Sequence, residues 1–243
     1  MKIKAYLSSA FCLFAIGTMP AGAAVLAAWT FQPQPFTDAE GANLTVGPSV
    51  TASSGIFSAT STATGFHASA ASDWTTPAGN ISSDSYSVNT FTVGDYFQFA
   101  TESTGYSGIT ITFDQTGSST GPKDFKVQYS TDGSSFTDLT GGAYVVLLNG
   151  GAPNTAWGPT TGGGPAYSFS FSLATVTALD NDASIFFRLS NTTATSIGGG
   201  TVSTGGTSRI DNFVVTGATA VPEPEGASII GALGVLALFR RRR

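Results

Sequence analysis

Cysteine and histidine are almost absent from the sequence. The 243 residues contain one cysteine, Cys12, and one histidine, His67. Cys12 lies in an N-terminal apolar segment, so the rest of the chain can form neither a disulfide nor a thiol nucleophile. A single histidine cannot build a multi-histidine metal site, and a structural or solvent-exposed role is the simpler interpretation of His67. We therefore expect a body that is stabilised by a packed core, with or without a bound metal ion.

Charged residues are also scarce, at 10% of the chain, and the basic ones are concentrated at its two ends. Six of the ten basic residues are terminal: Lys2, Lys4, Arg240, Arg241, Arg242 and Arg243. The remaining four accompany thirteen acidic residues, which gives residues 24–220 a net charge near −9. This charge argues against nucleic acid or an anionic lipid surface as an electrostatic partner, and it permits cation binding.

The C-terminal apolar segment is too short for an ordinary permanent membrane span. Gly226–Phe239 has 14 residues, and as a helix it would extend about 21 Å, against a hydrocarbon core of roughly 30 Å. The four arginines that follow it would keep the terminus cytoplasmic. The two prolines of Val221-Pro222-Glu223-Pro224 favour an extended backbone, open to the binding groove of an enzyme. A poorly optimised tail anchor is the alternative interpretation.

These three parts, in this order, resemble the PEP-CTERM sorting signal of Gram-negative bacteria. The resemblance covers residues 221–243, within a sorting segment that we place at 218–243. It implies that an exosortase, a membrane cysteine peptidase-transpeptidase, recognises Val221, Pro222, Glu223 and Pro224. It also implies transient insertion in the inner membrane, removal of the tail, and export to the cell surface or extracellular matrix, often beside exopolysaccharide production.

The N-terminus has the pattern of a signal peptide. Lys2 and Lys4 form a basic region, and Ala5–Ile16 form an apolar one. Ala21-Gly22-Ala23 fits a small-residue cleavage site, so we expect residues 1–23 to form a signal helix that signal peptidase removes. Phe11 before Cys12 does not fit a lipoprotein cleavage site.

The body, residues 24–217, alternates apolar and polar residues with the period of half-buried strands. We expect strands at Val25–Phe31, Tyr96–Phe99, Ile109–Phe113, Phe125–Tyr129, Tyr167–Leu173, Ile185–Leu189 and Ile210–Val215. Asp132-Gly133 between two such runs predicts a hairpin. No stretch shows a convincing helical period, so the pattern predicts two packed sheets.

Three segments of the body resemble the jelly-roll domains of many PEP-CTERM proteins, which are distantly similar to carbohydrate-binding modules. They are residues 105–113, 125–139 and 206–213, the last of the form Arg209-Ile210-Asp211-Asn212 plus a hydrophobic strand. The predicted fold is all-β: a jelly-roll-like antiparallel β-sandwich, flanked by an N-terminal signal helix and a short C-terminal apolar helix.

Calcium is the metal that the acidic residues suit best, because it prefers oxygen ligands. Asp180 and Asp182 flank Asn181, and Asp211 lies beside the last strand. Asp38 and Glu40 lie near the first strand, which in jelly rolls often pairs with the last. One structural Ca²⁺ held by some of these residues is the hypothesis, and solvated turns are the alternative. For Arg209 and Asp211, two apart on one strand face, we expect an ion pair.

Tryptophan offers an apolar face on which a sugar can stack. Trp74 and Trp157 have loop-like sequence surroundings, so they are carbohydrate-binding candidates, with packing beneath loops as the alternative. Trp29 is expected in the core.

Catalytic signatures are weak. Gly117–Gly121 formally fits the G-x-S-x-G pattern, but a nucleophile elbow needs a helix after it and a histidine later in the chain. Paired carboxylates could hydrolyse glycosides, but the acidic residues lie mostly in expected turns, and sequence alone cannot place two of them across a cleft. We expect a non-catalytic surface or matrix protein. The alternative is a carbohydrate-binding protein that holds extracellular polysaccharide, and a glycosidase has the least support.

Overall fold

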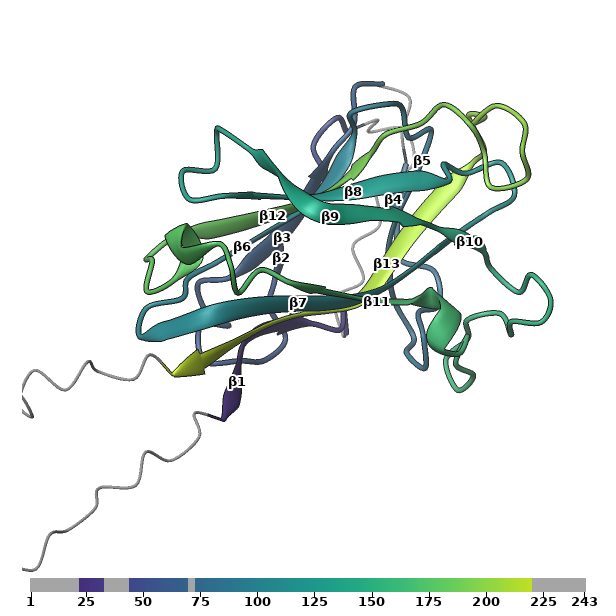
Figure 1. Ribbon diagram of the computed structural model, residues 1–243. Helices are drawn as coiled ribbons and strands as arrows, with labels where there is room; N and C mark the ends of the chain where they lie inside the picture. The colour runs from purple at the N-terminus through teal and green to yellow at the C-terminus, as the bar shows by residue number, and fades with distance from the viewer. Residues whose placement is uncertain (1–21, 33–43, 70–72, 220–243) are drawn as a thin grey trace, which may run out of the picture.

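The computed structural model describes residues 22–32, 44–69 and 73–219, which fold into two β-sheets packed face to face (Figure 1). Sheet A contains β1 (Ala23–Trp29), β4 (Trp74–Thr75), β5 (Tyr86–Asn89), β7 (Tyr106–Gly117), β10 (Leu147–Leu148), β11 (Ser168–Ser172) and β13 (Thr207–Thr219). Sheet B contains β2 (Val50–Thr51), β3 (Thr62–Phe66), β6 (Tyr96–Thr101), β8 (Asp124–Ser130), β9 (Thr137–Val145) and β12 (Ile185–Asn191). In the described residues, the helical turns are two short 3₁₀ turns, Pro165–Tyr167 and Thr177–Leu179. The predicted all-β, two-sheet body is confirmed.

Alternating side chains form the strands as expected. In β6, the residues from Tyr96 to Thr101 alternate between half-buried and buried, which places Phe97 and Phe99 in the core. The hairpin at Asp132-Gly133 joins β8 to β9, which pair antiparallel. β1 begins and ends two residues earlier than predicted, and β7 and β13 extend well beyond their predicted apolar runs.

β7 and β13 form the centre of sheet A, where they pair antiparallel. The other edge of β13 pairs with β5 along residues 207–210 and with β1 along residues 213–218. The other edge of β7 pairs with β11 and, over two residues, with β10 in parallel. Sheet A is therefore organised around β13, the last strand of the described chain.

Aromatic rings fill the space between the sheets. Phe99 of β6 and Phe213 of β13 stack with ring centroids 3.5 Å apart and planes 1° apart. Trp29 of β1 meets both rings edge-on, and Phe113 of β7 stacks on Phe213. These side chains are at most 2% exposed, so one aromatic cluster links both sheets.

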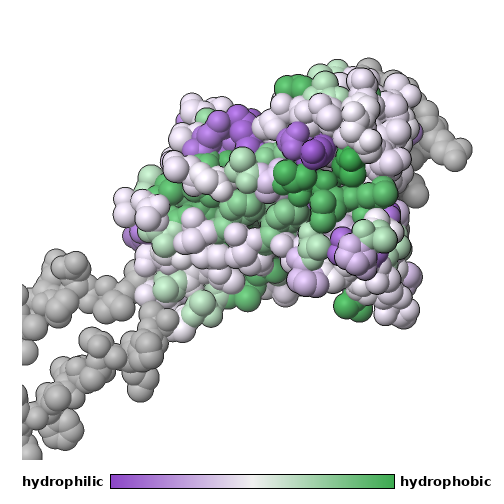
Figure 2. All heavy atoms as spheres, turned by 45° about the vertical axis from the view of Figure 1, so that its right-hand side comes forward, coloured by the Kyte–Doolittle hydropathy of each residue, from purple (hydrophilic) through white to green (hydrophobic). Residues whose placement is uncertain are grey.

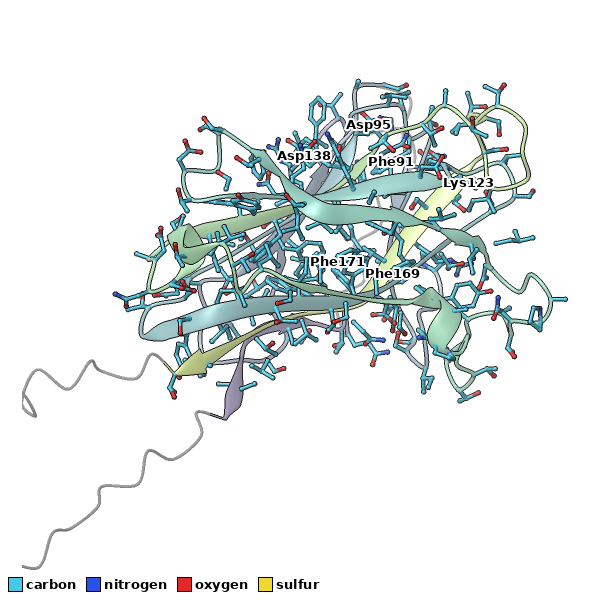
Figure 3. All side chains as sticks on the ribbon, viewed as in Figure 1. Phe91, Asp95, Lys123, Asp138, Phe169 and Phe171 are labelled. Atoms are coloured by element: carbon cyan, nitrogen blue, oxygen red, sulfur yellow. The ribbon has the colours of Figure 1, made fainter. Side chains whose placement is uncertain are left out.

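The two long sides of the sandwich differ. On one side the backbone of β1 forms hydrogen bonds with residues 53–57, for example from Ala28 N–H to the Ser54 carbonyl (2.8 Å), and closes the space between the sheets. On the other side β9 and β11 are edge strands, and Phe169 and Phe171 of β11 reach across to Tyr144 of β9 (Figure 3). Figure 2 shows apolar side chains gathered in a band on this side.

Both ends of the described chain leave from the same corner of the sandwich (Figure 1). Ala23 of β1 pairs with Ala218 of β13. Residues 1–21 of the predicted signal helix and the whole predicted C-terminal apolar helix lie outside the described residues. The last residue of the predicted signal helix, Ala23, is the first residue of strand β1 instead. Within those residues, no helix has the length and apolar character that a membrane crossing requires.

Truncation of Phe213 tests the central role of the aromatic cluster. Phe213→Ala leaves a cavity against Phe99, Trp29 and Phe113, so we expect the free energy of unfolding to fall by about 3–5 kcal/mol. Urea denaturation followed by tryptophan fluorescence measures this change. Val145→Ala, at a side chain 45% exposed, is the control and should change it by less than about 0.5 kcal/mol. Equal effects of the two substitutions would contradict this account of the core.

Candidate functional site

A β-bulge in β13 sets two polar side chains against the outer face of sheet A. The register between β13 and β7 shifts between Asp211 and Val214, and Asn212 has a φ of 52°. Because of this extra residue, Ile210 and Phe213 both point into the core although they are three apart. Asp211 and Asn212 are left on the outer side, opposite Asp114 of β7.

Asp211 is completely buried by the loop that precedes β5. Its Oδ2 accepts hydrogen bonds from the Ser82 hydroxyl (2.6 Å) and from the backbone N–H of Asn80 (2.8 Å). Its Oδ1 accepts one from the backbone N–H of Asn212 (2.8 Å). A Cβ on Gly79 would lie 2.3 Å from this carboxylate, so only glycine allows the loop to approach so closely.

Asp114, 9% exposed, completes the cluster from the neighbouring strand. Its Oδ2 accepts from the side-chain amides of Asn80 and Asn212, each at 2.9 Å. Its Oδ1 accepts from the hydroxyl of Ser168, on β11 (2.5 Å). We call Asn80, Ser82, Asp114, Asp211 and Asn212 the carboxylate cluster. It connects β7, β11, β13 and the loop before β5.

The electrostatics of the cluster are unusual, because two neighbouring carboxyl groups are buried together. Burial raises the pKa of Asp211 to about 6, and the negative charge of Asp114 adds to this shift. The three hydrogen bonds that Asp211 accepts act in the opposite direction. Asp211 is therefore a carboxyl group that gains a proton within a mildly acidic range.

Only one of the two carboxyl groups reaches a surface pocket. Asp114, Ser168 and Asn212 line a pocket of about 390 Å³ on the outer face of sheet A, and Asp211 does not line it. The oxygens of Asp114 are already hydrogen-bonded to three donors. The pair therefore does not flank a space in which a glycoside could lie between two carboxyl groups, which that hydrolysis requires. Its evident task is to hold the loop and three strands together.

The predicted ion pair between Arg209 and Asp211 is wrong. Arg209 donates to the carbonyl of Ala78 (2.9 Å), and its guanidinium lies 5.8 Å from the ring centre of Trp157. The carboxylate of Asp211 instead accepts hydrogen bonds from Ser82, Asn80 and Asn212. Burial lowers the pKa of Arg209 below its usual value.

Trp74 is a core residue, so its prediction as a carbohydrate contact is wrong. Its side chain is 0% exposed and packs against Tyr86 and Phe97, while its Nε1–H donates to the carbonyl of Leu44 (2.8 Å). The indole offers no face to a ligand, because it packs in the aromatic core although its neighbours in the sequence are polar.

Trp157 is also a packed side chain and is not exposed to a ligand, so its prediction as a carbohydrate contact is wrong. It is 5% exposed and meets Tyr167 edge-on at 6.1 Å. A Cβ on Gly163 would lie 2.6 Å from its ring, so the glycine-rich loop covers the indole closely. Its Nε1–H has no hydrogen-bond acceptor within the described ranges.

The predicted calcium ligands do not come together as one site. Asp180 accepts from the backbone N–H of Gly108 (2.9 Å), and Asp182 accepts from that of Ser184 (2.9 Å). Asp211 lies opposite Asp114, six residues further along β7 than Gly108, or on the order of 20 Å away. Asp38 and Glu40 lie outside the described residues. Among those that are described, no three His, Cys, Asp or Glu side chains form a group that could hold a metal ion.

His67 is buried and hydrogen-bonded, as in the structural interpretation. Its Nδ1 accepts from the backbone N–H of Ser69 (3.0 Å), and its Nε2 lies 3.1 Å from the carbonyl of Asn89. Burial lowers the pKa of His67, against the opposing charge of Asp95. The formal G-x-S-x-G match at 117–121 joins strand β7 to strand β8, so no helix follows it.

The residues of the predicted sorting motif, Val221, Pro222, Glu223 and Pro224, and the four arginines from Arg240 to Arg243 lie outside the described residues. The described part of the structure ends at Thr219, two residues before Val221.

No protein-family model matches the chain, and no curated protein matches it. Among solved structures, the K3 cleaved adhesin domain of Lys-gingipain from Porphyromonas gingivalis is 19% identical, over 58% of this chain and 83% of that one, with a TM-score of 0.35. TmCBM61 in complex with β-1,4-galactotriose is 12% identical, over 76% and 88%, with a TM-score of 0.29. The enzymatically active domain of tailspike protein 4 of bacteriophage CBA120 is 12% identical, over 58% and 17%, with a TM-score of 0.32. Likenesses of this size assign the chain no function.

The raised pKa of Asp211 predicts a pH-dependent stability. The folded state favours the protonated carboxyl, so this stabilisation is complete below pH 3.8 and is lost as the pH rises through about 6. Asp211→Asn keeps a neutral group of the same shape. From about pH 4 to pH 7, we expect the stability of the variant to rise relative to wild type by up to ~3 kcal/mol.

Urea denaturation of both proteins at each pH measures this difference, and the other titrating groups cancel in it. Asp138→Asn, at an exposed carboxylate whose pKa is lowered by its bonds to Lys126 and Gln128, is the matched control. Its stability relative to wild type should show no such rise. A pH-independent difference for Asp211→Asn would contradict the assignment.

Proposed function

We propose that the chain is an exported, non-catalytic protein of the cell surface or extracellular matrix, which an exosortase recognises and cleaves at its C-terminal segment. The observation that carries this proposal is the order of Val221–Pro224, the apolar Gly226–Phe239 and the arginines from Arg240 to Arg243. This order suits a membrane peptidase. Such an enzyme needs access to an extended backbone, and it needs its substrate's motif held at a fixed depth relative to the membrane by the short apolar helix and its basic end.

Each part of the tail has a separate physical task in this proposal. Pro222 and Pro224 keep the motif extended, so that it can enter a binding groove without first losing other structure. Gly226–Phe239 holds the chain in the inner membrane only transiently, because 14 residues are fewer than the roughly 20 of a stable span. The arginines hold the C-terminus on the cytoplasmic side.

The position of the chain ends supports this arrangement. β1 and β13 pair at Ala23 and Ala218, so the segments before and after the body start from one corner of the sandwich. Both segments could therefore approach the same membrane while the whole body stands on its outer side. After cleavage near Val221, β13 would remain intact, because it ends at Thr219.

The body supports a role in presentation and contact. Its strands from β5 to β8 alternate between the two sheets, and β1 lies beside β13, in keeping with a jelly-roll type of sandwich. The one histidine, His67, is buried, and its ring is hydrogen-bonded to the backbone, which fits a structural role. The excess of acidic residues keeps the body soluble and away from nucleic acid and anionic lipid.

Processing is tested in the native host. We expect mass spectrometry of the mature protein to find a C-terminus at or before Glu225 and no Arg240–Arg243. Replacement of both Pro222 and Pro224 by alanine should remove the extended motif, leave the tail intact and keep the chain in the membrane fraction. Pro159→Ala, at an exposed proline of the body, is the control and should be processed normally. An exported protein that still ends at Arg243 would contradict the proposal.

A further inference from the structure

A second pocket, which we call the end pocket, lies between two loops at one end of the sandwich. The loop from β5 to β6 contributes residues 90–93, and the loop from β12 to β13 contributes Ala194 and residues 201–204. Its volume is about 400 Å³, within the range of small-molecule sites. Figure 3 shows Phe91 near this end, away from the corner where the two chain ends leave.

The inner surface of the end pocket is apolar. Phe91 is 1% exposed and packs in the core beneath the pocket, and the side chains of Val93, Ala194 and Val202 line it. Val93 is 59% exposed, so its side chain is accessible to a ligand. A ligand with an apolar face would remove this surface from water, which stabilises the bound state.

Hydroxyl groups supply the polar contacts of the pocket. The hydroxyls of Thr90 and Thr92 are taken by the Thr204 carbonyl and by Asp95. Those of Thr201, Ser203 and Thr204 bond to no other group in the described parts of the chain, and all three side chains are exposed. These hydroxyls can each donate and accept, which suits a ligand that is itself rich in hydroxyls.

Among the residues that the structure describes, no charged one lines the end pocket. A charged ligand would lose hydration there without gaining an opposite charge, so the lining favours a neutral one. The apolar side chains and the exposed hydroxyls together favour a neutral ligand that combines an apolar face with hydroxyl groups.

The walls are held by backbone hydrogen bonds rather than by the ligand. Val202 N–H donates to the Ala194 carbonyl (2.9 Å), and Ser203 N–H donates to that of Thr120 (3.1 Å). Because the loop is already ordered, binding has little conformational entropy to overcome.

The end pocket lies at the end of the sandwich that is far from the two chain ends, where an extended ligand could reach it. Thr204 lies just before β13, which runs for 13 residues to Thr219, so the pocket is about 40 Å from the strand's far end. The yellow-green loops in Figure 1 show this separation from the termini. A body held to a membrane by its tail would present the end pocket outward.

We propose that the end pocket binds a neutral hexose residue of an extracellular polysaccharide, with the pyranose face against Val93, Ala194 and Val202 and its hydroxyls bonded to Thr201, Ser203 and Thr204. This inference deepens the proposed function by naming the ligand class of the exported body. It rests on that function only for the setting in which the polymer is met. The binding itself does not depend on processing of the tail.

Methyl NMR titration of the full chain tests this site. The probes are β-1,4-linked hexasaccharides of glucose, mannose and galactose, with an oligomannuronate as the charged control and an apolar hexapeptide as the competing occupant. We expect at least one neutral hexasaccharide to shift the methyl signals of Val93, Ala194, Val202 and Thr204. The charged oligosaccharide and the peptide should leave these signals unchanged.

Two variants then test the contacts. Val202→Trp fills the pocket and should weaken binding at least tenfold, while Val145→Trp, at an exposed valine on β9, should leave it unchanged. Thr201, Ser203 and Thr204 replaced together by alanine should weaken binding about three- to thirtyfold without changing the melting temperature, because these side chains are exposed.

The proposal is overturned if no neutral hexasaccharide shifts these signals at millimolar concentration, or if the charged sugar or the peptide binds there instead. It is also overturned if Val202→Trp binds as well as wild type. Failure here is separate from failure of the tail to be cleaved, since one is measured on the purified chain and the other in the host.

Discussion

The structure depends on the hydrogen bonding of β13 along both of its edges. This strand pairs with β7 on one side and with β5 and β1 on the other, and its Phe213 lies at the centre of the aromatic cluster. The bulge within it allows Ile210 and Phe213 both to face the core, and it turns Asp211 outward into the carboxylate cluster. The end pocket lies near its beginning, and the proposed sorting motif follows its end.

Local patterns were sufficient to predict the strands with clear apolar alternation, but not the strands from β2 to β5 or β10, and not which strands are neighbours. The alternation in β6, β8 and β12 reflects side chains that face the core at every second residue, so it is visible in any single segment. The pairing of Asp211 with Asp114 joins residues 97 apart along the chain, and no local pattern encodes it. The same limit applies to the end pocket, since its two loops are more than 100 residues apart.

The predictions that proved wrong concerned individual side chains whose neighbours in the sequence differ from their neighbours in the folded structure. Trp74 lies among polar residues in the chain, yet it is in a two-residue strand whose inner face meets Tyr86 and Phe97. Arg209 and Asp211 are neighbours on one strand face, but the loop before β5 offers each a closer partner. A long loop that folds back over a sheet cannot be placed from composition, and here it decides which polar groups are buried.

The pairing of the first described strand with the last has a consequence for how the chain folds. Ala23 and Ala218 are almost 200 residues apart, so β1 can take its place only after nearly the whole body has been made. Contacts at such separation require closure of a long loop and give a high contact order, which slows folding. Sheet A is therefore incomplete throughout synthesis. A chain of this topology completes sheet A only when its last strand arrives.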